Sequence, residues 1–293
     1  MKCRIKSNLI ITLFAAGLIA GCSSSHVASS NFTIITSFYP LYIMAENVTA
    51  GVDGITLVDL APPTIGCLHD WSPSTEDFKK LAQADIFLTQ GAGMEGFLDR
   101  VVAGYPSLKV VHLSDGIPFI VSNNIPNPHT WLNVDYAIIM VQNLASALAS
   151  ADPPHAVQYN HNAAAYIAKL TSLRDEMKTA LAPYAGTAII TFHEAFPYFA
   201  QEFGLVIVAV VEREPGSEPS ARDLADLISM IRAKGIKTIF VEPQYPSQVA
   251  DTIARETGVR ILTLDPAVTG SNDPDAYLAA MRANMKALLE GLR

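Results

Sequence analysis

Short apolar runs alternate with amphipathic stretches along the chain, and the alternation occurs in two similar halves. The apolar runs predict four strands in each half, at 32–38, 55–60, 85–91 and 108–114, and then at 187–192, 205–211, 237–243 and 259–265. The amphipathic stretches predict helices at 41–49, 74–84, 94–102 and 134–150 in the first half, and at 220–234, 247–257 and 274–292 in the second. A further helix is predicted between the strand at 187–192 and Phe203. Continuous apolar strands between amphipathic helices are typical of parallel sheets covered on both faces. We therefore predict an α/β fold with two (βα)4 domains.

A long helical stretch separates the halves. Pro153-Pro154 suits the first turn of a helix, and Pro183 ends the pattern. Between them the apolar residues fall at helical spacing, namely Tyr166, Leu170, Leu173, Met177 and Leu181. We predict one long helix over 153–183 that joins a first domain (32–152) to a second (184–293). The alternative is two shorter helices with a turn near Asn160 or Asn162.

The N-terminus has the pattern of a secretory signal peptide. A basic start is followed by the apolar run Leu9–Ala20, which is shorter than the about 20 residues of a membrane-spanning helix. The run closes with LIAGC at 18–22, which resembles the bacterial lipobox. We expect a signal peptide at 1–21, lipidation of Cys22, and a Ser-rich tether at 22–31. The protein would then be extracytoplasmic and lipid-anchored to the bacterial cell membrane, in the periplasm or at the surface. An ordinary signal peptide with an incidental cysteine is the alternative.

The net charge limits the possible partners, and the cysteine content limits the possible disulfides. The formal charge is −8, and removal of residues 1–21 leaves 17 basic and 28 acidic residues, a charge of −11. An acidic surface argues against nucleic acid and is compatible with a cationic ligand. Cys67 would be the one unmodified thiol in the folded region, so no intramolecular disulfide is expected and stability must come from a core.

Four side chains are candidate metal ligands because each follows a predicted strand: His69, His129, His193 and Asp265. Ligands bind outside the carboxyl ends of parallel strands, so two sheets facing each other across a cleft would let these four converge. Three imidazoles and a carboxylate suit tetrahedral zinc. Taken singly, each histidine could be structural, and Asp265-Pro266 could be a turn or a helix cap.

Four ordered motifs carry a specific resemblance. They are HDWSPSTEDFKKLAQADIFLTQGAGMEGFLDR at 69–100, NPHTWLN at 127–133, TFHEAFPYFAQEFGL at 191–205 and TLDPAV at 263–268. Together with GSEPSARDL and FVEPQYPS, they resemble the zinc/manganese group of solute-binding proteins of ABC importers. The resemblance implies His69, His129, His193 and Asp265 as metal ligands between the domains. It also implies a partner permease driven by an ATPase. The long helix predicted between the halves indicates small domain motions.

The third ligand position bears on the choice of metal. In the family that the chain resembles, His there accompanies zinc and Glu accompanies manganese. His193 therefore favours zinc, although Glu194 is adjacent, and imidazole suits zinc whereas manganese prefers oxygen. Cys67 stands two residues before His69. It could be a soft additional ligand, or a half-buried cysteine in an irregular loop.

Competing functions are less well supported. A zinc hydrolase would need an open coordination position, with Glu194 or Glu242 as its base, but the chain has no HExxH or GxSxG motif. A manganese-preferring receptor with an adhesin role and a receptor for a chelated metal or small organic ligand are the remaining candidate functions. We expect a monomeric zinc receptor without enzyme activity.

Overall fold

The computed structural model describes residues 31–68, 71–96, 103–212, 219–244 and 248–293. Residues Asn31–Arg293 form one compact unit that contains both predicted sheets. The predicted signal peptide, the tether with Cys22, and His69 lie outside the described residues. So does most of the helix predicted at 94–102, of which residues 94–96 form a turn.

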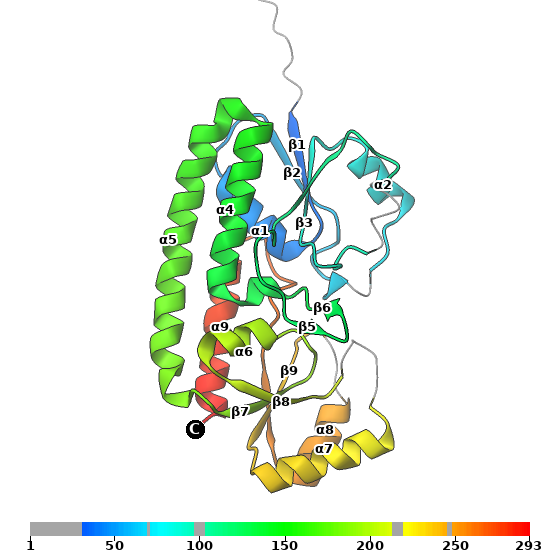
Figure 1. The fold of residues 1–293 in the computed structure, drawn as a ribbon, viewed down its shortest axis with the longest axis vertical. Coiled ribbons are helices and arrows are strands. Elements are labelled where there is room, and N and C mark those ends of the chain that lie inside the picture. The colour runs from blue at the N-terminus through cyan, green and yellow to red at the C-terminus, as the bar shows by residue number, and fades with distance from the viewer. Residues whose placement is uncertain (1–30, 69–70, 97–102, 213–218, 245–247) are drawn as a thin grey trace, which may run out of the picture. The chain divides into compact units, whose positions relative to one another are not determined.

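The first sheet has four parallel strands in the order β2-β1-β3-β4 (Figure 1). The strands are β1 Phe32–Thr36, β2 Ile55–Asp59, β3 Ile86–Thr89 and β4 Lys109–His112. The helices of this half are α1 Tyr39–Thr49, α2 Thr75–Leu81 and α4 Val134–Ala151. A short antiparallel hairpin, β5 Val121–Ser122 with β6 Ile125–Pro126, was not predicted. Its turn residues Asn123 and Asn124 have φ of 51° and 63°, as a type I′ turn requires.

The second sheet repeats this arrangement with the order β10-β9-β7-β8, all parallel. Its strands are β7 Ala188–Thr191, β8 Val206–Val210, β9 Thr238–Val241 and β10 Arg260–Thr263. Its helices are α6 Pro197–Phe203, α7 Ala221–Lys234, α8 Gln248–Thr257 and α9 Ala276–Gly291. In both sheets the first strand of the half lies between the second and the third. The predicted fold class is confirmed.

Local sequence explains where several helices begin and end. Ser74 caps α2 and Ser220 caps α7, each in a reciprocal capping box with the Asp three residues later. These capping boxes account for where the helices predicted at 74–84 and 220–234 begin. Gly204 and Gly235 end α6 and α7 in the left-handed conformation, at φ of 69° and 65°, which costs least for glycine.

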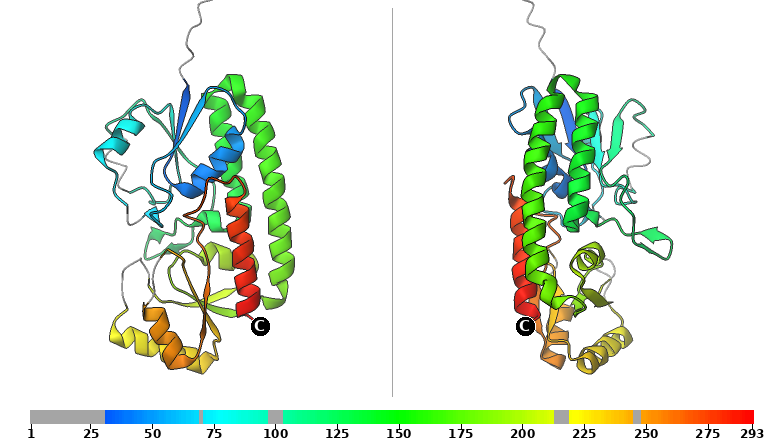
Figure 2. Two further views of the ribbon diagram at one scale, coloured as in Figure 1. Left: turned by 180° about the vertical axis from the view of Figure 1, so that it is seen from behind. Right: turned by 60° about the vertical axis from the view of Figure 1, so that its left-hand side comes forward.

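The linking helix α5, Ala156–Leu181, is continuous through Asn160 and Asn162, so the single-helix prediction is confirmed. Short 3-10 turns at Pro153–His155 and Ala182–Tyr184 flank it. Its buried side chains include all five that carried the predicted spacing. The helix packs against α1 and α4 of the first half and α6 and α9 of the second (Figures 1 and 2).

Helix α4 is long and apolar enough to cross a membrane by length and composition alone. Its buried residues, which include Met140, Val141, Leu144 and Leu148, lie in the core shared with α1 and α5. It is therefore accounted for as a core helix of the compact unit.

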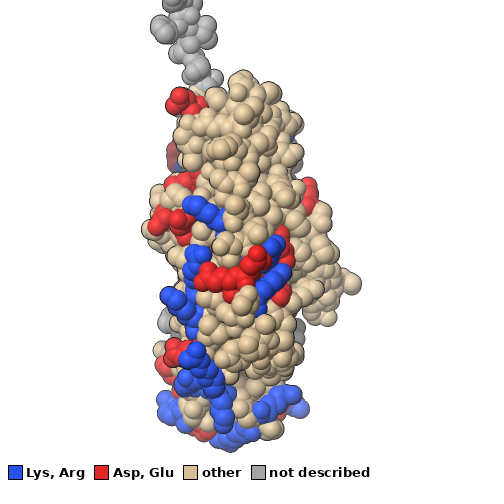
Figure 3. Space-filling view, turned by 90° about the vertical axis from the view of Figure 1, so that its left-hand side faces the viewer, with Lys and Arg blue, Asp and Glu red and all other residues tan. Residues whose placement is uncertain are grey.

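The surface over α5 and α9 carries mixed charge. Lys169 lies 2.7 Å from Asp275, and Glu176 lies 2.9 Å from Arg282, so two ion pairs join the helices. Figure 3 shows acidic and basic side chains side by side on this face, with Lys and Arg gathered toward its lower end. Exposed pairs of this kind stabilise a fold only weakly, so the apolar contacts of α5 hold the halves together.

Candidate metal-binding site

His129 is buried, with 2% of its surface exposed, in the loop between β6 and α4. The backbone N–H of His129 donates to Asn127 Oδ1 over 3.0 Å, which identifies that atom as the amide oxygen. The same oxygen lies 3.0 Å from Nδ1 of His129. Because an amide oxygen can only accept, Nδ1 carries the proton and the lone pair is on Nε2. The ring is thus held ready to bind a cation through Nε2.

Cys67 lies on the Nε2 side of this ring. Its Sγ is 3.5 Å from Nε2 of His129, and the cysteine is 2% exposed. The half-buried environment considered for Cys67 is therefore wrong, because the side chain is fully buried and in contact with a candidate ligand.

His193 follows β7 closely and is 3% exposed. Its ring centroid lies 5.1 Å from that of His129, with the ring planes at 84°. Nδ1 of His193 is 3.3 Å from Oε1 of Glu242, which directly follows β9. The first half of the chain supplies one imidazole and the second half supplies the other, as predicted.

A cavity of about 370 Å³ adjoins both rings. His129, His193 and Glu194 form part of its wall, and the β5–β6 hairpin forms another part through Ser122 and Ile125. The two histidines are therefore both buried and reachable from a hollow in the surface, which a binding site for a small ion requires.

Glu95 shapes the loop that forms the opposite wall, where Ala92 and Gly93 line the cavity. Its carboxylate accepts hydrogen bonds from Ser37 Oγ and from the backbone N–H groups of Gln90 and Gly91. Burial raises the pKa of Glu95, although these donors oppose the shift. The Gly-Glu-rich turn of the first motif thus folds around a buried carboxyl.

Asp265 follows β10, but it does not line the cavity. Its Oδ1 accepts from Gln244 Nε2 at 3.2 Å and from the backbone N–H of Ala267 at 2.8 Å. Asn284 holds the backbone of Asp265 through two bonds of 2.7 Å. The turn considered for Asp265-Pro266 is therefore present, since a carboxylate bonding the N–H two residues on is an Asx-turn.

The loop after β10 is tied to the loop of His129. Trp131 Nε1 donates to the carbonyl of Pro266 over 2.8 Å, and the Trp131 ring lies 5.2 Å from the His129 ring. Tyr39 donates to the carbonyl of Ser271 in the same region. Burial, followed by the charge of Asp265, raises the pKa of Tyr39 to about 12, so this hydroxyl keeps its proton. Asp265 therefore lies on a loop that is hydrogen-bonded, through Pro266 and Trp131, to the loop of His129.

Of the four predicted ligands, the structure brings His129 and His193 together. Asp265 stands on the adjoining loop, and His69 is outside the described residues. Within the described ranges, no three His, Cys, Asp or Glu side chains form a group that could hold a metal ion. From the sequence, Glu242 was considered only as the base of a hydrolase. Its position just after a strand, at the same sheet edge as the other candidates, was the signal that could have found it.

The family of zinc-uptake complex component A periplasmic proteins, ZnuA, matches residues 34–291. The chain belongs to this family. The resemblance stated from the four motifs is confirmed, and the family is one of solute-binding proteins rather than enzymes.

Individual proteins that this chain resembles agree with the family match. Zinc-binding protein AdcA of Streptococcus pyogenes serotype M1 is 30% identical over 98% of this chain, which spans 61% of AdcA. The high-affinity zinc uptake system protein ZnuA of Bacillus subtilis is 28% identical, over 98% of this chain and 97% of that protein. The solved structure of the SBP FpvC of Pseudomonas aeruginosa in complex with Mn²⁺ is 31% identical with a TM-score of 0.81, covering 89% of this chain and 98% of FpvC.

Proposed function

We propose that this protein is an extracytoplasmic receptor that binds zinc and delivers it to an ABC-type importer. Two buried imidazoles, one from each half of the fold, meet at a surface cavity, and this observation supports the proposal most directly. The zinc-binding and zinc-uptake names of the relatives agree with it. We propose His69, His129, His193 and Asp265 as the zinc ligands.

The chemistry of the described donors fits zinc. Neutral imidazole is a preferred zinc ligand, and Asn127 holds His129 in the tautomer that offers Nε2. For Asp265 to bind the same ion, its carboxylate must release Gln244 or offer its second oxygen. The ligand loops would therefore adjust while the strands that carry them stay in place.

Manganese is the alternative cargo within the same family. The similar structure of FpvC was solved in complex with Mn²⁺, which keeps this alternative open for the present chain. Imidazole-rich sites favour zinc over manganese in both ligand type and intrinsic affinity. A receptor for zinc should accordingly bind it more tightly than manganese in a direct comparison.

The proposal includes an anchor and a partner. The signal peptide at 1–21, lipidation at Cys22 and the tether at 22–31 would hold the receptor beside an importer permease in the membrane. The domains proposed at 32–152 and 184–293, joined at 153–183, would present the ion between them to that permease as a monomer. Mass spectrometry of the N-terminal peptide from isolated membranes would detect the lipid on Cys22, and an unmodified Cys22 would contradict the anchor.

Isothermal titration of the metal-free protein with Zn²⁺ and with Mn²⁺ tests the central claim. We expect one equivalent of zinc to bind tightly and manganese to bind more weakly. His193→Ala should weaken zinc binding by more than about 100-fold, because losing a ligand should cost more than losing one of its supporting partners. His161→Ala, which changes an exposed histidine on α5, is the matched control and should bind like the wild type. Equal binding by the His193 variant and the wild type would refute the proposal.

A further inference from the structure

Glu242 is a buried carboxyl that the proposed ligand set does not use. Strand β9 pairs with β7 so that Phe240 stands opposite Thr191. Glu242 and His193 each follow two residues later, so the parallel register carries both side chains past the same edge of the sheet. The pairing of the strands thus explains why Oε1 of Glu242 and Nδ1 of His193 lie 3.3 Å apart.

Glu242 is buried and has little polar contact among the described residues. Its side chain is 1% exposed, and among the described residues neither carboxylate oxygen has a hydrogen bond. An ionised carboxylate in such a place is costly unless a cation or a donor compensates it. Within the described ranges, Nδ1 of His193 lies within ion-pair distance of Glu242, and the His193 ring lies edge-on against the ring of His129.

The side of the ring that faces Glu242 determines which nitrogen can bind metal. A carboxylate beside Nδ1 favours the tautomer with a proton on Nδ1, which leaves the lone pair on Nε2. Nε2 lies on the far side of the ring from Glu242, so Glu242 itself is placed behind the imidazole and not in the coordination shell. Nδ1 of His129 also faces an oxygen, but there the oxygen belongs to the neutral amide of Asn127, at 3.0 Å.

We propose that Glu242 is a positioning residue, which fixes His193 with Nε2 toward the cavity and contributes the negative charge that favours a divalent cation there. The inference rests on the proposed metal-binding function. A carboxylate behind an imidazole raises its basicity as a ligand, and removing such a partner typically lowers metal affinity by about 10–100-fold.

Two variants separate the charge of Glu242 from the presence of a polar side chain at that position. Glu242→Gln keeps an oxygen that can accept from Nδ1–H but removes the charge, and Glu242→Ala removes both. In zinc titrations we expect about a tenfold weaker affinity for the Gln variant and about a 100-fold weaker affinity for the Ala variant, with one equivalent bound in each. Glu202→Gln, a change of another buried carboxyl that lies on α6, is the matched control and should bind zinc like the wild type.

The tautomer of His193 gives a second readout that needs no metal. In ¹⁵N NMR spectra of the metal-free protein, assigned with His193→Ala, we expect the Nδ1–H tautomer in the wild type and in Glu242→Gln. We expect loss of that preference in Glu242→Ala. A merely structural role would leave the tautomer unchanged, so an unchanged tautomer together with wild-type zinc affinity in both variants would overturn the inference.

The outcomes also distinguish this inference from the proposed function. If the wild type binds no divalent metal, the proposed function fails, and the NMR result alone decides whether Glu242 orients His193. If the wild type binds zinc and His193→Ala does not, but both Glu242 variants bind normally, the proposed function stands and the role of Glu242 is refuted.

Discussion

The distance between Cys67 and His129 is compatible with both side chains binding the same zinc ion. In a tetrahedral zinc shell with Zn–S of about 2.3 Å and Zn–N of about 2.0–2.1 Å, adjacent sulfur and nitrogen donors lie about 3.5 Å apart. Sγ of Cys67 is 3.5 Å from Nε2 of His129, the nitrogen that carries the lone pair. Oδ1 of Asp265 already accepts two hydrogen bonds. Cys67 and Asp265 are thus two candidates for one coordination position.

If Cys67 takes that position in place of Asp265, Cys67→Ser should lower zinc affinity by about tenfold or more, because a thiolate is a much better zinc ligand than a hydroxyl. Titration with Co²⁺ in place of zinc gives an independent check, since sulfur ligation adds a sulfur-to-cobalt charge-transfer band. The band should be present in the wild type and in Asp265→Asn, and absent in Cys67→Ser. Wild-type affinity in the serine variant and no such band would show that Cys67 only packs against His129.

The sequence predicts His193 at the site because residues that follow strands of parallel sheets share an edge. The β5–β6 hairpin separates His129 from β4, so for His129 the NPHTWLN motif is the stronger signal. The contact of Cys67 with His129 could not be predicted, since it depends on the path of a loop across 62 positions of the chain. The engagement of Asp265 by Gln244 is equally a matter of loop conformation. Residue types and strand ends therefore predict which groups gather, whereas loop geometry decides which atoms face the ion.

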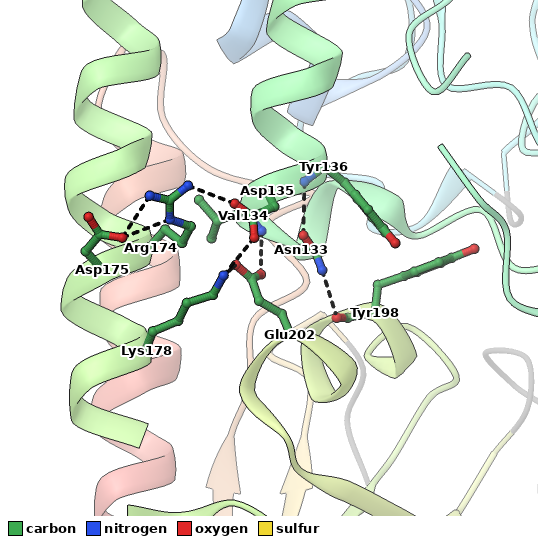
Figure 4. A network of polar contacts seen from close by, with 9 residues as sticks. All are labelled: Asn133, Val134, Asp135, Tyr136, Arg174, Asp175, Lys178, Tyr198 and Glu202. Carbon is green, nitrogen blue, oxygen red and sulfur yellow. Dashed lines mark hydrogen bonds and ion pairs between the residues drawn. The ribbon is translucent and has the colours of Figure 1, made fainter. Parts of the chain in front are cut away.

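At the scale of the elements, the start of α4 is the point where both halves meet α5 (Figure 4). The backbone N–H of Val134 donates to Oε2 of Glu202 on α6 at 2.6 Å, which satisfies a helix N-terminus with a carboxyl from the other half. Asp135 bonds Arg174 and Lys178 of α5, and Nζ of Lys178 lies 3.9 Å from Oε1 of Glu202. The charged side chains of α4, α5 and α6 therefore form one electrostatic network.

Burial raises the pKa of Glu202 to about 7, and the nearby Asp135 adds to the shift, whereas Val134 N–H and Lys178 oppose it. Tyr277 of α9 is also electrostatically coupled to Glu202 and keeps its proton, because burial raises its pKa far above 10.0. Between pH 4.5 and about 7 the folded protein holds a proton on Glu202 that the unfolded chain releases. The stability from this group is present below pH 4.5 and is lost as the pH rises to about 7.

We therefore expect Glu202→Gln to reduce the fall in unfolding free energy between pH 4.5 and about 7, because the amide does not titrate and can still accept from Val134 N–H. Urea unfolding curves at several pH values measure this slope. Some slope should remain, since burial also raises the pKa of Asp59 to about 7. Glu176→Gln, at a partly exposed ion pair, should keep the wild-type slope. An unaltered slope in the Glu202 variant would contradict the expectation.

Most elements could be predicted from the sequence because their signals are local. Ser74, Ser220 and the glycines after α6 and α7 mark helix ends through backbone hydrogen bonds and the left-handed conformation. The β5–β6 hairpin was missed, since two-residue strands show no hydrophobic alternation and its Asn123-Asn124 turn lacks glycine. The contact of Glu202 with the start of α4 could not be predicted from the sequence. Glu202 and Val134 are 68 positions apart, and tertiary packing brings them together.

At the scale of the whole compact unit, hydrogen bonds connect the two halves in addition to α5, and they bear on how far the halves can open. Tyr277 donates to the carbonyl of Trp131, and Asn47 donates to that of Pro274. Tyr198 of α6 donates to the carbonyl of Asn127 and accepts from the backbone N–H of Ile120. Opening a wide hinge would break these bonds, most of which are buried or part-buried, and would also bend α5. The arrangement favours metal exchange by movement of ligand loops.

We accordingly expect the metal-free and zinc-loaded proteins to have the same radius of gyration in small-angle X-ray scattering, and the same arrangement of the two sheets in crystals. A comparison variant is Ala168→Pro, which changes an exposed position of α5. Proline there removes a helix hydrogen bond and kinks the helix, at a cost of about 3 kcal/mol, while the packed face is kept. If the stiffness of α5 limits opening, the radius of gyration of this variant should be larger without zinc and should decrease when zinc is added. A wild-type protein that itself contracts markedly on binding zinc would mean that α5 and the bonds around Trp131 do not restrain the halves, and that closure of a hinge, rather than movement of the ligand loops, encloses the ion.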